Sequence, residues 1–276
     1  MNTLRPDKTG IGATALLMGL ALLFAYPFLW MFFSSFKPND AIFQPWPLWP
    51  ETFQWQSYRA LLGNAVIPFG RQFANTAFIA GMQTLLALAL CSMAGFVLAH
   101  YRFKFRSLIV VAAISVIVLP RQAMILPLFT WMNHLRLLDT PWSVILPGAV
   151  SGIGLLFFWQ AWRRIPEALL HAARVEGAGE GRIFLTLLPL MKPTALAYGL
   201  IHFVFAWQEH LIPLIMLNSK ANLTLGISLA TLNSSSLHTP YSFLMAASTL
   251  AVLPAAAAFV LLFRPLRSAL AEMTGQ

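Results

Sequence analysis

Residues 74–99 have the sequence ANTAFIAGMQTLLALALCSMAGFVLA, which contains no charged side chain. A helix needs about 20 mostly apolar residues to cross the roughly 30 Å hydrocarbon core of a bilayer, because each of its backbone amides must find a partner within the helix. The run exceeds that length. We therefore expect residues 74–99 to form a membrane-spanning helix, and this expectation decides the fold class of the chain.

Five further apolar runs meet the same requirement, near residues 13–35, 107–126, 141–162, 194–217 and 242–263. The charge-free stretch from Thr9 to Phe36 is too long for the core of a signal peptide and lacks a small-residue cleavage site, so we count it as a span. The sequence contains no internal duplication or separate soluble segment. It predicts an all-α polytopic membrane protein with six transmembrane helices, forming a single transmembrane domain over residues 1–276.

The composition favours a lipid environment and gives no support to catalysis. Of the 276 residues, 58% are hydrophobic and only 10% are charged, whereas a soluble domain usually carries about a quarter charged residues. Cys91 is the only cysteine, which excludes a multi-cysteine metal site. No Gly-x4-Gly-Lys-Ser/Thr loop, Gly-x-Ser-x-Gly turn or His-Glu-x-x-His pair occurs. We therefore expect no catalytic residues, metal or cofactor in this chain.

The 18 basic residues outnumber the 9 acidic ones, and their positions predict the orientation, because Lys and Arg are retained on the cytoplasmic side. One set of connections contains twelve of them: Arg5, Lys8, Arg102, Lys104, Arg106, Arg163, Arg164, Arg174, Arg182, Lys192, Arg264 and Arg267. The opposite set contains six: Lys37, Arg59, Arg71, Arg121, Arg136 and Lys220. Both termini are therefore expected in the cytoplasm, and the basic balance requires no nucleic-acid partner.

Two local patterns predict contacts with other helices and with the membrane interface. Small residues recur every four positions in the second expected span, at Ala87, Cys91, Gly95 and Ala99, and such a stripe lets another helix approach closely. Residues 37–70 are rich in Trp, Tyr and Pro. We expect them to form an outer loop with a short helix around Trp55–Leu62, whose aromatic rings lie at the membrane interface rather than bind sugar.

Glu209 is the only acidic residue within an expected span. A carboxylate in hydrocarbon is costly, so it should face a cavity or a partner, and Arg121, Gln208 and His210 are the candidate partners. We assign Arg121, Trp207, Gln208 and Glu209 to the translocation path or to polar contacts between helices. A structural bond to a neighbouring helix or subunit is favoured over contact with a substrate.

The longest polar interruption, residues 165–193, lies between the fourth and fifth expected spans. Pro166 suits the start of a helix and Gly177 suits its end, which predicts a helix of about three turns. At helical spacing, Glu167, His171 and Arg174 form a polar stripe, and the adjacent face contains Leu169, Ala172, Ala173 and Glu176. Such a helix can lie on the membrane surface or enter a groove on a partner. Residues 179–182 are expected to break the chain before it returns to the bilayer.

The sequence of residues 165–178, IPEALLHAARVEGA, is followed by Ile183-Phe184 and by Leu-Pro-Leu-x-x-Pro at 188–193. This pattern resembles the EAA loop of permease subunits of bacterial ABC importers. Further similarity to the carbohydrate-importer branch, which contains the maltose permeases, covers essentially the whole chain. It lies at Tyr26–Trp30, Ser34–Pro38, Asn75, Ala99–Phe103, Pro120, Pro127, Leu138–Thr140, Trp207–Glu209 and Pro213.

The resemblance implies that the chain is the membrane-spanning subunit of an ATP-driven importer in the bacterial cytoplasmic (inner) membrane, translocating a sugar or related polyol by alternating access. It implies three kinds of protein partner: a second permease forming a heterodimer, a dimer of ATPase subunits that holds ATP and Mg²⁺, and an extracytoplasmic solute-binding protein. It also makes the helix in 165–193 a cytoplasmic coupling helix. The implied docking residues are Glu167, Leu169, His171, Ala172, Ala173, Arg174, Glu176, Gly177 and Ala178.

The sequence departs from the family pattern at two positions. His171 stands where the family has its glutamate, and Glu176 stands where an aspartate is usual. A neutral imidazole cannot replace a carboxylate in pairing with a basic residue. Either His171 acts through hydrogen bonds, or Glu167, one turn earlier, supplies the carboxylate.

Two alternatives have the same composition: an ion-coupled secondary transporter and, less favoured, a multispan membrane enzyme. A secondary transporter would ordinarily show internal repeats, interrupted spans or several charges within the membrane. We expect none of these features here, and the absence of a catalytic constellation counts against an enzyme.

Overall fold

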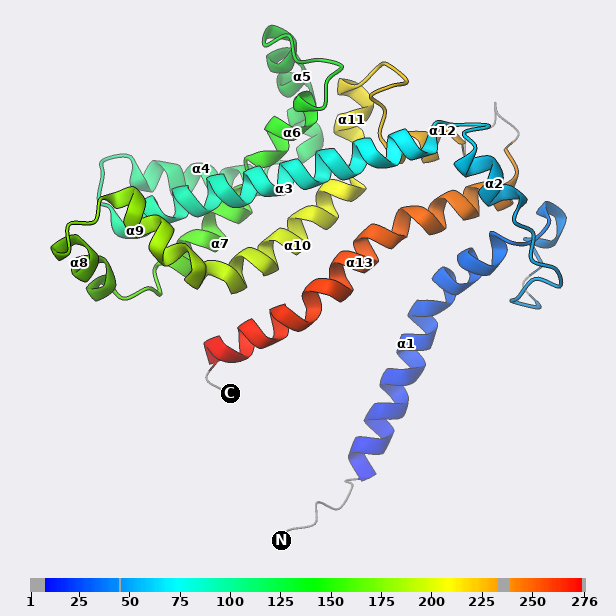
Figure 1. The fold of residues 1–276 in the computed structure, drawn as a ribbon, viewed down its shortest axis with the longest axis horizontal. Helices are drawn as coiled ribbons and strands as arrows, with labels where there is room; N and C mark the ends of the chain where they lie inside the picture. The colour runs from blue at the N-terminus through cyan, green and yellow to red at the C-terminus, as the bar shows by residue number, and fades with distance from the viewer. Residues whose placement is uncertain (1–7, 45, 233–238, 275–276) are drawn as a thin grey trace. The chain divides into compact units, whose positions relative to one another are not determined.

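The computed structural model describes residues 8–44, 46–232 and 239–274, and every regular element in them is a helix (Figure 1). In chain order these are α1 (Lys8–Ser34), η1 (Asn39–Ala41), α2 (Gln56–Leu62), α3 (Phe69–His100), α4 (Arg106–Val118), η2 (Arg121–Met124), α5 (Ile125–His134), α6 (Trp142–Ala149), α7 (Gly152–Trp162), α8 (Glu167–Val175), α9 (Glu180–Leu187), η3 (Leu188–Met191), α10 (Lys192–Gln208), α11 (Leu211–Met216), α12 (Leu225–Leu232) and α13 (Tyr241–Thr274). Arg5, which entered the prediction of orientation, lies outside the described residues.

Four helices in the described residues are long and apolar enough to cross a membrane: Gly12–Ser34, Phe69–His100, Glu180–Gln208 and Tyr241–Phe263. Two bent pairs pass the same test when each is joined, namely Arg106–Val118 with Arg121–His134 and Trp142–Ala149 with Gly152–Trp162. Counting each pair as one span gives the six expected. The prediction of an all-α polytopic membrane protein is confirmed.

The expectation of uninterrupted spans is wrong, and the largest bend lies in the third. The axes on either side of Leu119 and Pro120 meet at 109°, and both residues are extended, with ψ of 128°. Pro120 accounts for this bend, because proline has no N–H to donate and disfavours helical dihedral angles at the preceding residue.

The fourth span bends by 43° between α6 and α7. Val150 is extended there, and Ser151 follows it as the N-cap of α7. The Ser151 hydroxyl accepts a hydrogen bond from the Gly154 N–H at 3.1 Å. This cap satisfies one of the amide donors that the break would otherwise leave without a partner.

The fifth span differs from the predicted range of 194–217 at both ends. The break predicted at residues 179–182 ends at Gly179, which is the N-cap of α9, and the candidate span begins at Glu180. α10 then ends at Gln208, and Glu209 is extended. Its carboxylate caps α11, with Oε1 accepting from the N–H groups of Leu211 at 3.0 Å and Ile212 at 3.4 Å.

The chain divides into two compact units, Met1–Gly70 with Leu229–Leu253, and Arg71–Ser228 with Pro254–Gln276. In the first unit, the Phe36 ring organises the loop after α1. Its centroid lies 5.3, 5.0 and 5.1 Å from those of Phe53, Trp55 and Tyr58. α2 begins directly after Trp55, so the short helix expected around Trp55–Leu62 is confirmed.

In the second unit, the stripe of small residues on α3 packs against α7. Ala87 and Cys91 are buried. A Cβ added to Gly95 would lie 2.8 Å from both the Cβ of Phe158 and the backbone nitrogen of Trp159. The absence of a side chain therefore sets the distance between the two helices, and the packing role predicted for the stripe is confirmed.

Asp139 connects the turn between α5 and α6 to the segment after α11, also within the second unit. Its Oδ1 accepts from the backbone N–H groups of Ser219 and Asn218, both at 2.9 Å. Its own N–H donates to the Met216 carbonyl at 2.8 Å. The N–H groups of Ser219 and Asn218 lower the pKa of the Asp139 carboxyl, because they stabilise its charged form.

The Gly95 contact predicts that Gly95→Ala destabilises the protein. The new Cβ would meet the backbone of α7, which cannot move aside without shifting the helix, so we expect a loss of about 1–3 kcal/mol in the free energy of unfolding. Thermal unfolding in detergent measures it. Gly81→Ala on the same helix is the matched control, because a Cβ at Gly81 meets no atom within 4 Å. Equal stability of the two variants would contradict the prediction.

The lowered pKa of Asp139 predicts a loss of stability in acid. Its stabilising effect is complete above the ordinary aspartate pKa of about 4 and disappears as the pH falls through the lower value in the folded protein. We expect the melting temperature of the wild type to fall more steeply below about pH 4 than that of Asp139→Asn. Asp40→Asn, at an exposed position in η1, should follow the wild type. Parallel acid profiles of wild type and Asp139→Asn would show that the link contributes nothing.

Candidate functional site

α8 is bounded by the two residues that the sequence indicated. Pro166 precedes it with extended dihedral angles, and Gly177 follows it with φ of +80°, a left-handed value that glycine adopts without strain. The Gly177 N–H donates to the Arg174 carbonyl at 2.9 Å, and the Ala178 N–H donates to the Ala173 carbonyl at 3.0 Å. These two bonds form a Schellman motif. The helix predicted between Pro166 and Gly177 is confirmed, at nine residues.

One side of α8 is fixed to the membrane-spanning helices. Leu170 is only 2% exposed and belongs to a buried cluster with Phe96 of α3, Trp162 of α7 and Ile183 of α9. The Trp162 indole N–H donates to the Ser92 carbonyl of α3 at 3.0 Å. Because the cluster joins four helices, α8 cannot be displaced alone without opening buried apolar surface to water.

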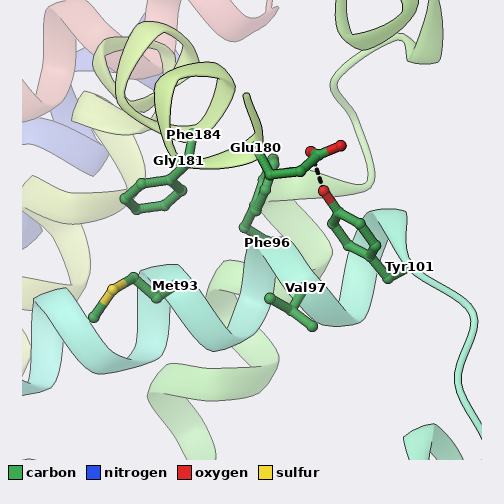
Figure 2. A pocket seen from close by; sticks show the side chains of 7 residues that line it. All are labelled: Met93, Phe96, Val97, Tyr101, Glu180, Gly181 and Phe184. Carbon is green, nitrogen blue, oxygen red and sulfur yellow. Dashed lines mark hydrogen bonds between the residues drawn. The ribbon is translucent and has the colours of Figure 1, made fainter. Parts of the chain in front are cut away.

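A polar cluster joins the same region at the surface. Glu180 accepts from Arg174 Nε at 3.0 Å through Oε1. Figure 2 shows its second bond, in which Oε2 accepts from the Tyr101 hydroxyl. The Arg174 guanidinium also lies over the Tyr101 ring, 5.9 Å from its centroid. Glu180 was absent from the predicted site. Its position at the first residue of a helix, where a carboxylate interacts favourably with the helix dipole, is the signal that could have indicated it.

An apolar pocket of about 360 Å³ lies beside this cluster, between α3 and α9 (Figure 2). Met93, Phe96 and Val97 line it from α3, and Phe184 lines it from α9. Its polar lining residues, Tyr101 and Glu180, already bond to each other. The pocket therefore offers apolar contact and no group prepared for a polar ligand.

The structure leaves most of the predicted docking residues accessible. The exposed ones are Glu167, Leu169, His171, Ala172, Arg174, Glu176 and Gly177. Ala173 and Ala178 instead pack against the buried cluster around Trp162, so the predicted small-residue face is divided between the surface and the core. The outward surface also includes Val175, which the prediction omitted and which is 88% exposed.

Glu209 pairs with Arg121, one of the three partners that the sequence indicated. Glu209 Oε2 lies 3.3 Å from Arg121 Nη1, and the Glu209 side chain is 14% exposed. Because Oε1 caps α11, each oxygen of this carboxylate has a partner. The pair joins the chain at the break after α4 to the chain at the break after α10.

The other two residues assigned to the translocation path or to polar contacts between helices lie in the last turn of α10. The Trp207 ring is buried, with its centroid 5.4 Å from that of Phe73 and 5.9 Å from that of Phe203. Gln208 is exposed at the end of α10. Trp207 therefore packs against aromatic rings, and Gln208 is accessible at the surface.

Arg121 and Glu209 line a cavity of about 260 Å³ within the second unit. Other lining residues come from the breaks in the third and fourth spans and from the middle of α3 and α10; the polar ones are Gln83, Ser151, Tyr198 and His202. The Tyr198 hydroxyl lies 3.1 Å from His202 Nδ1. Sequence analysis missed these four residues, because polar side chains isolated in apolar runs show no spacing that indicates a common cavity.

Comparison with known proteins gives consistent results. Residues 91–270 match the model of a family described as binding-protein-dependent transport system inner membrane component. The chain is 34% identical over 248 residues to the arabinooligosaccharides transport system permease protein AraQ of Bacillus subtilis, covering 88% of each chain. It is 28% identical to the sn-glycerol-3-phosphate transport system permease protein UgpE of Yersinia enterocolitica, covering 88% of this chain and 89% of the relative.

The fold is similar to that of a chain in the crystal structure of a bacterial ABC transporter involved in the import of the acidic polysaccharide alginate. The TM-score is 0.83 at 19% sequence identity, and the match covers 95% of this chain and 99% of the other. The two chains therefore share one fold along nearly their whole length.

The Glu180 cluster predicts that Glu180→Gln loosens the attachment of α8. Loss of the charge weakens the bonds from Arg174 and Tyr101, so amide hydrogen exchange of residues 167–178 should accelerate about twofold, a small effect because the pair is exposed. Mass spectrometry of the purified protein measures it. Glu176→Gln, at an exposed position at the end of α8, is the control. Unchanged exchange in Glu180→Gln would show that the cluster does not hold the helix.

Proposed function

Since the chain belongs to the family of binding-protein-dependent transport system inner membrane components, we propose how its loop and its spans divide the work of transport. It is a membrane-spanning permease of an importer for a sugar or related polyol. The observation that carries this function is the family match over residues 91–270, together with permease relatives aligned along 88% of the chain.

The α8–α9 loop is the surface that docks onto the ATPase subunit. The exposed side of α8 presents both charge and apolar side chains, including Glu167, His171 and Leu169, the last 44% exposed. Its opposite side is fixed through Leu170 to the buried core. When a partner displaces a helix held in this way, the spans packed against it must move as well.

Glu167 is the carboxylate that we assign to pairing with a basic residue of the ATPase. It is exposed at the first residue of α8, one turn before His171. His171 then contributes hydrogen bonds without a permanent charge. This assignment keeps a negative group on the docking stripe although the family's glutamate is absent.

The complete importer contains a second permease as a heterodimeric partner, a dimer of ATPase subunits that bind ATP and Mg²⁺, and a solute-binding protein outside the membrane. Nucleotide binding closes the ATPase pair, and the docked α8 helices convert that closure into a switch between inward-facing and outward-facing packings of the spans. Nucleotide chemistry takes place entirely on the partner. The permeases supply the path and the two alternative conformations.

The α8–α9 loop and both termini are assigned to the cytoplasm. The bond from Tyr101 to Glu180 holds the basic 100–106 loop beside the basic 163–193 loop. This proximity supports the grouping on which the count of Lys and Arg depends. The bacterial inner membrane is the corresponding location, with the loop around α2 on its outer face.

Glu167→Lys tests the docking role. In proteoliposomes containing the complete importer, the reversed charge should lower ATP-driven uptake of radiolabelled arabinotriose by about tenfold or more, because like charges would face each other at the docking surface. The amount of permease in the membrane should not change. Glu51→Lys, an equal charge reversal at an exposed position in the loop before α2, is the matched control.

Two outcomes would contradict this proposal. Normal uptake by Glu167→Lys would reject the assigned role of that carboxylate. Uptake by the wild-type chain reconstituted without ATPase subunits, driven by an ion gradient, would reject the importer-subunit function itself.

A further inference from the structure

Two interrupted spans and the end of a third span meet at one cavity. Leu119 and Arg121 line it from the break after α4, Ser151 lines it from the break before α7, and Glu209 lines it from the break after α10. Where a helix is interrupted inside a membrane, the freed backbone groups must face protein or a polar cavity. Solute sites of membrane transporters are commonly built at such interruptions. The position of the cavity therefore favours its interpretation as a solute site over its interpretation as a packing defect.

Two residues that line this cavity each contain a buried polar atom with no hydrogen-bond partner within the protein. Gln83 is 3% exposed, and its Oε1 is unpartnered. His202 Nε2 is likewise buried and unpartnered. A buried polar atom without a partner costs about 1–3 kcal/mol, so a polar group bound in the cavity that bonded to these atoms would recover part of that free energy.

Gly148 of α6 makes room for the Gln83 side chain. A Cβ at Gly148 would lie 1.1 Å from Gln83 Nε2, so any other residue at this position would displace the amide. On the facing side, Tyr198 is buried and its hydroxyl contacts His202 Nδ1 at 3.1 Å. Neighbouring residues thus define the positions of both side chains.

We propose that this cavity binds one ring of an uncharged polyhydroxylated solute, with Gln83 and His202 as its hydrogen-bonding residues. A hydroxyl group both donates and accepts, so it can donate to Gln83 Oε1 and can satisfy His202 Nε2 in either tautomer. A phosphate or carboxylate that is fully ionised offers acceptors only and would leave Gln83 Oε1 unpartnered.

The charges around the cavity also favour an uncharged solute. Arg121 is the cationic side chain of the lining, and Glu209 lies 3.3 Å from it. The positive charge is therefore already balanced, and an anionic solute would meet no free cation there. The volume of about 260 Å³ lies below the range of roughly 300–1,000 Å³ that is typical of sites for larger ligands, which suits one ring rather than an entire oligosaccharide.

This inference rests on the proposed function, and one experiment separates the two. The complete importer is reconstituted in proteoliposomes, and we measure the number of solute molecules imported per ATP hydrolysed, with radiolabelled arabinotriose and sn-glycerol-3-phosphate as probes. Gln83→Leu should lower this ratio for arabinotriose about three- to tenfold, the effect of one lost hydrogen bond. A variant that is only less well folded would lose import and hydrolysis together and keep the ratio.

Gln72→Leu is the matched control, because Gln72 is equally buried on α3, also has an unpartnered Oε1, and does not line this cavity. Its ratio should equal that of the wild type. If Gln83→Leu does not assemble, Gly148→Ala provides the second test, since its methyl group displaces only the end of the flexible Gln83 side chain. It should lower the ratio in the same direction.

Each outcome decides a different claim. An unchanged ratio in Gln83→Leu, or in Gly148→Ala where that variant is used, would overturn the proposed site while leaving the importer intact. Import of sn-glycerol-3-phosphate but not arabinotriose by the wild type would overturn the assignment of an uncharged solute. If a panel of sugars and polyols that includes both probes shows no ATP-dependent import, the proposed function is overturned and, with it, this inference.

Discussion

Every backbone amide inside the bilayer must have a hydrogen-bond partner, and the rest of the structure depends on this requirement. The spans satisfy it by helix formation, and side chains satisfy it where two of the spans are interrupted and where a third one ends. Ser151 caps α7 after one break, and Glu209 caps α11 after another. The same Glu209 carboxylate also pairs with Arg121 beside the third break. Residues that supply these partners therefore line the cavity, and the cavity that we propose for a polar solute is a consequence of where the helices break.

The α8–α9 loop and the cavity are connected by continuous helices. α3 contributes Phe96 to the buried cluster under α8 and Gln83 to the cavity. Glu180 and His202 lie on a single candidate span, Glu180–Gln208. A displacement of α9 by a docked partner would therefore move the cavity wall directly, through packed helices, without a separate relay. Close contacts such as that between Gly95 and α7 make this assembly stiff.

Properties that depend on neighbouring residues were predictable from the sequence, whereas those that depend on distant partners were not. Pro166 and Gly177 marked the ends of α8 correctly, because helix termination is decided within a few residues. The four-residue period of Ala87, Cys91 and Gly95 indicated a packing face for the same reason.

Other features could be recognised only from the folded structure. The sequence showed Pro120 without revealing that the chain would bend by 109° there, since many membrane helices keep a proline with only a kink. Arg174 lay on the predicted docking stripe, yet it bonds to Glu180. Gln83 and His202 gain significance only because folding brings residues from α3 and α10 to one cavity.

The Arg121–Glu209 pair also bears on how the importer responds to the membrane potential. A single charge that crosses the whole membrane changes in energy by about 2.3 kcal/mol per 100 mV. Two opposite charges 3.3 Å apart that move together carry no net charge, so the electric field does no net work on this pair. A displacement of the intact pair therefore requires the same electrical work, close to none, in energised and depolarised cells.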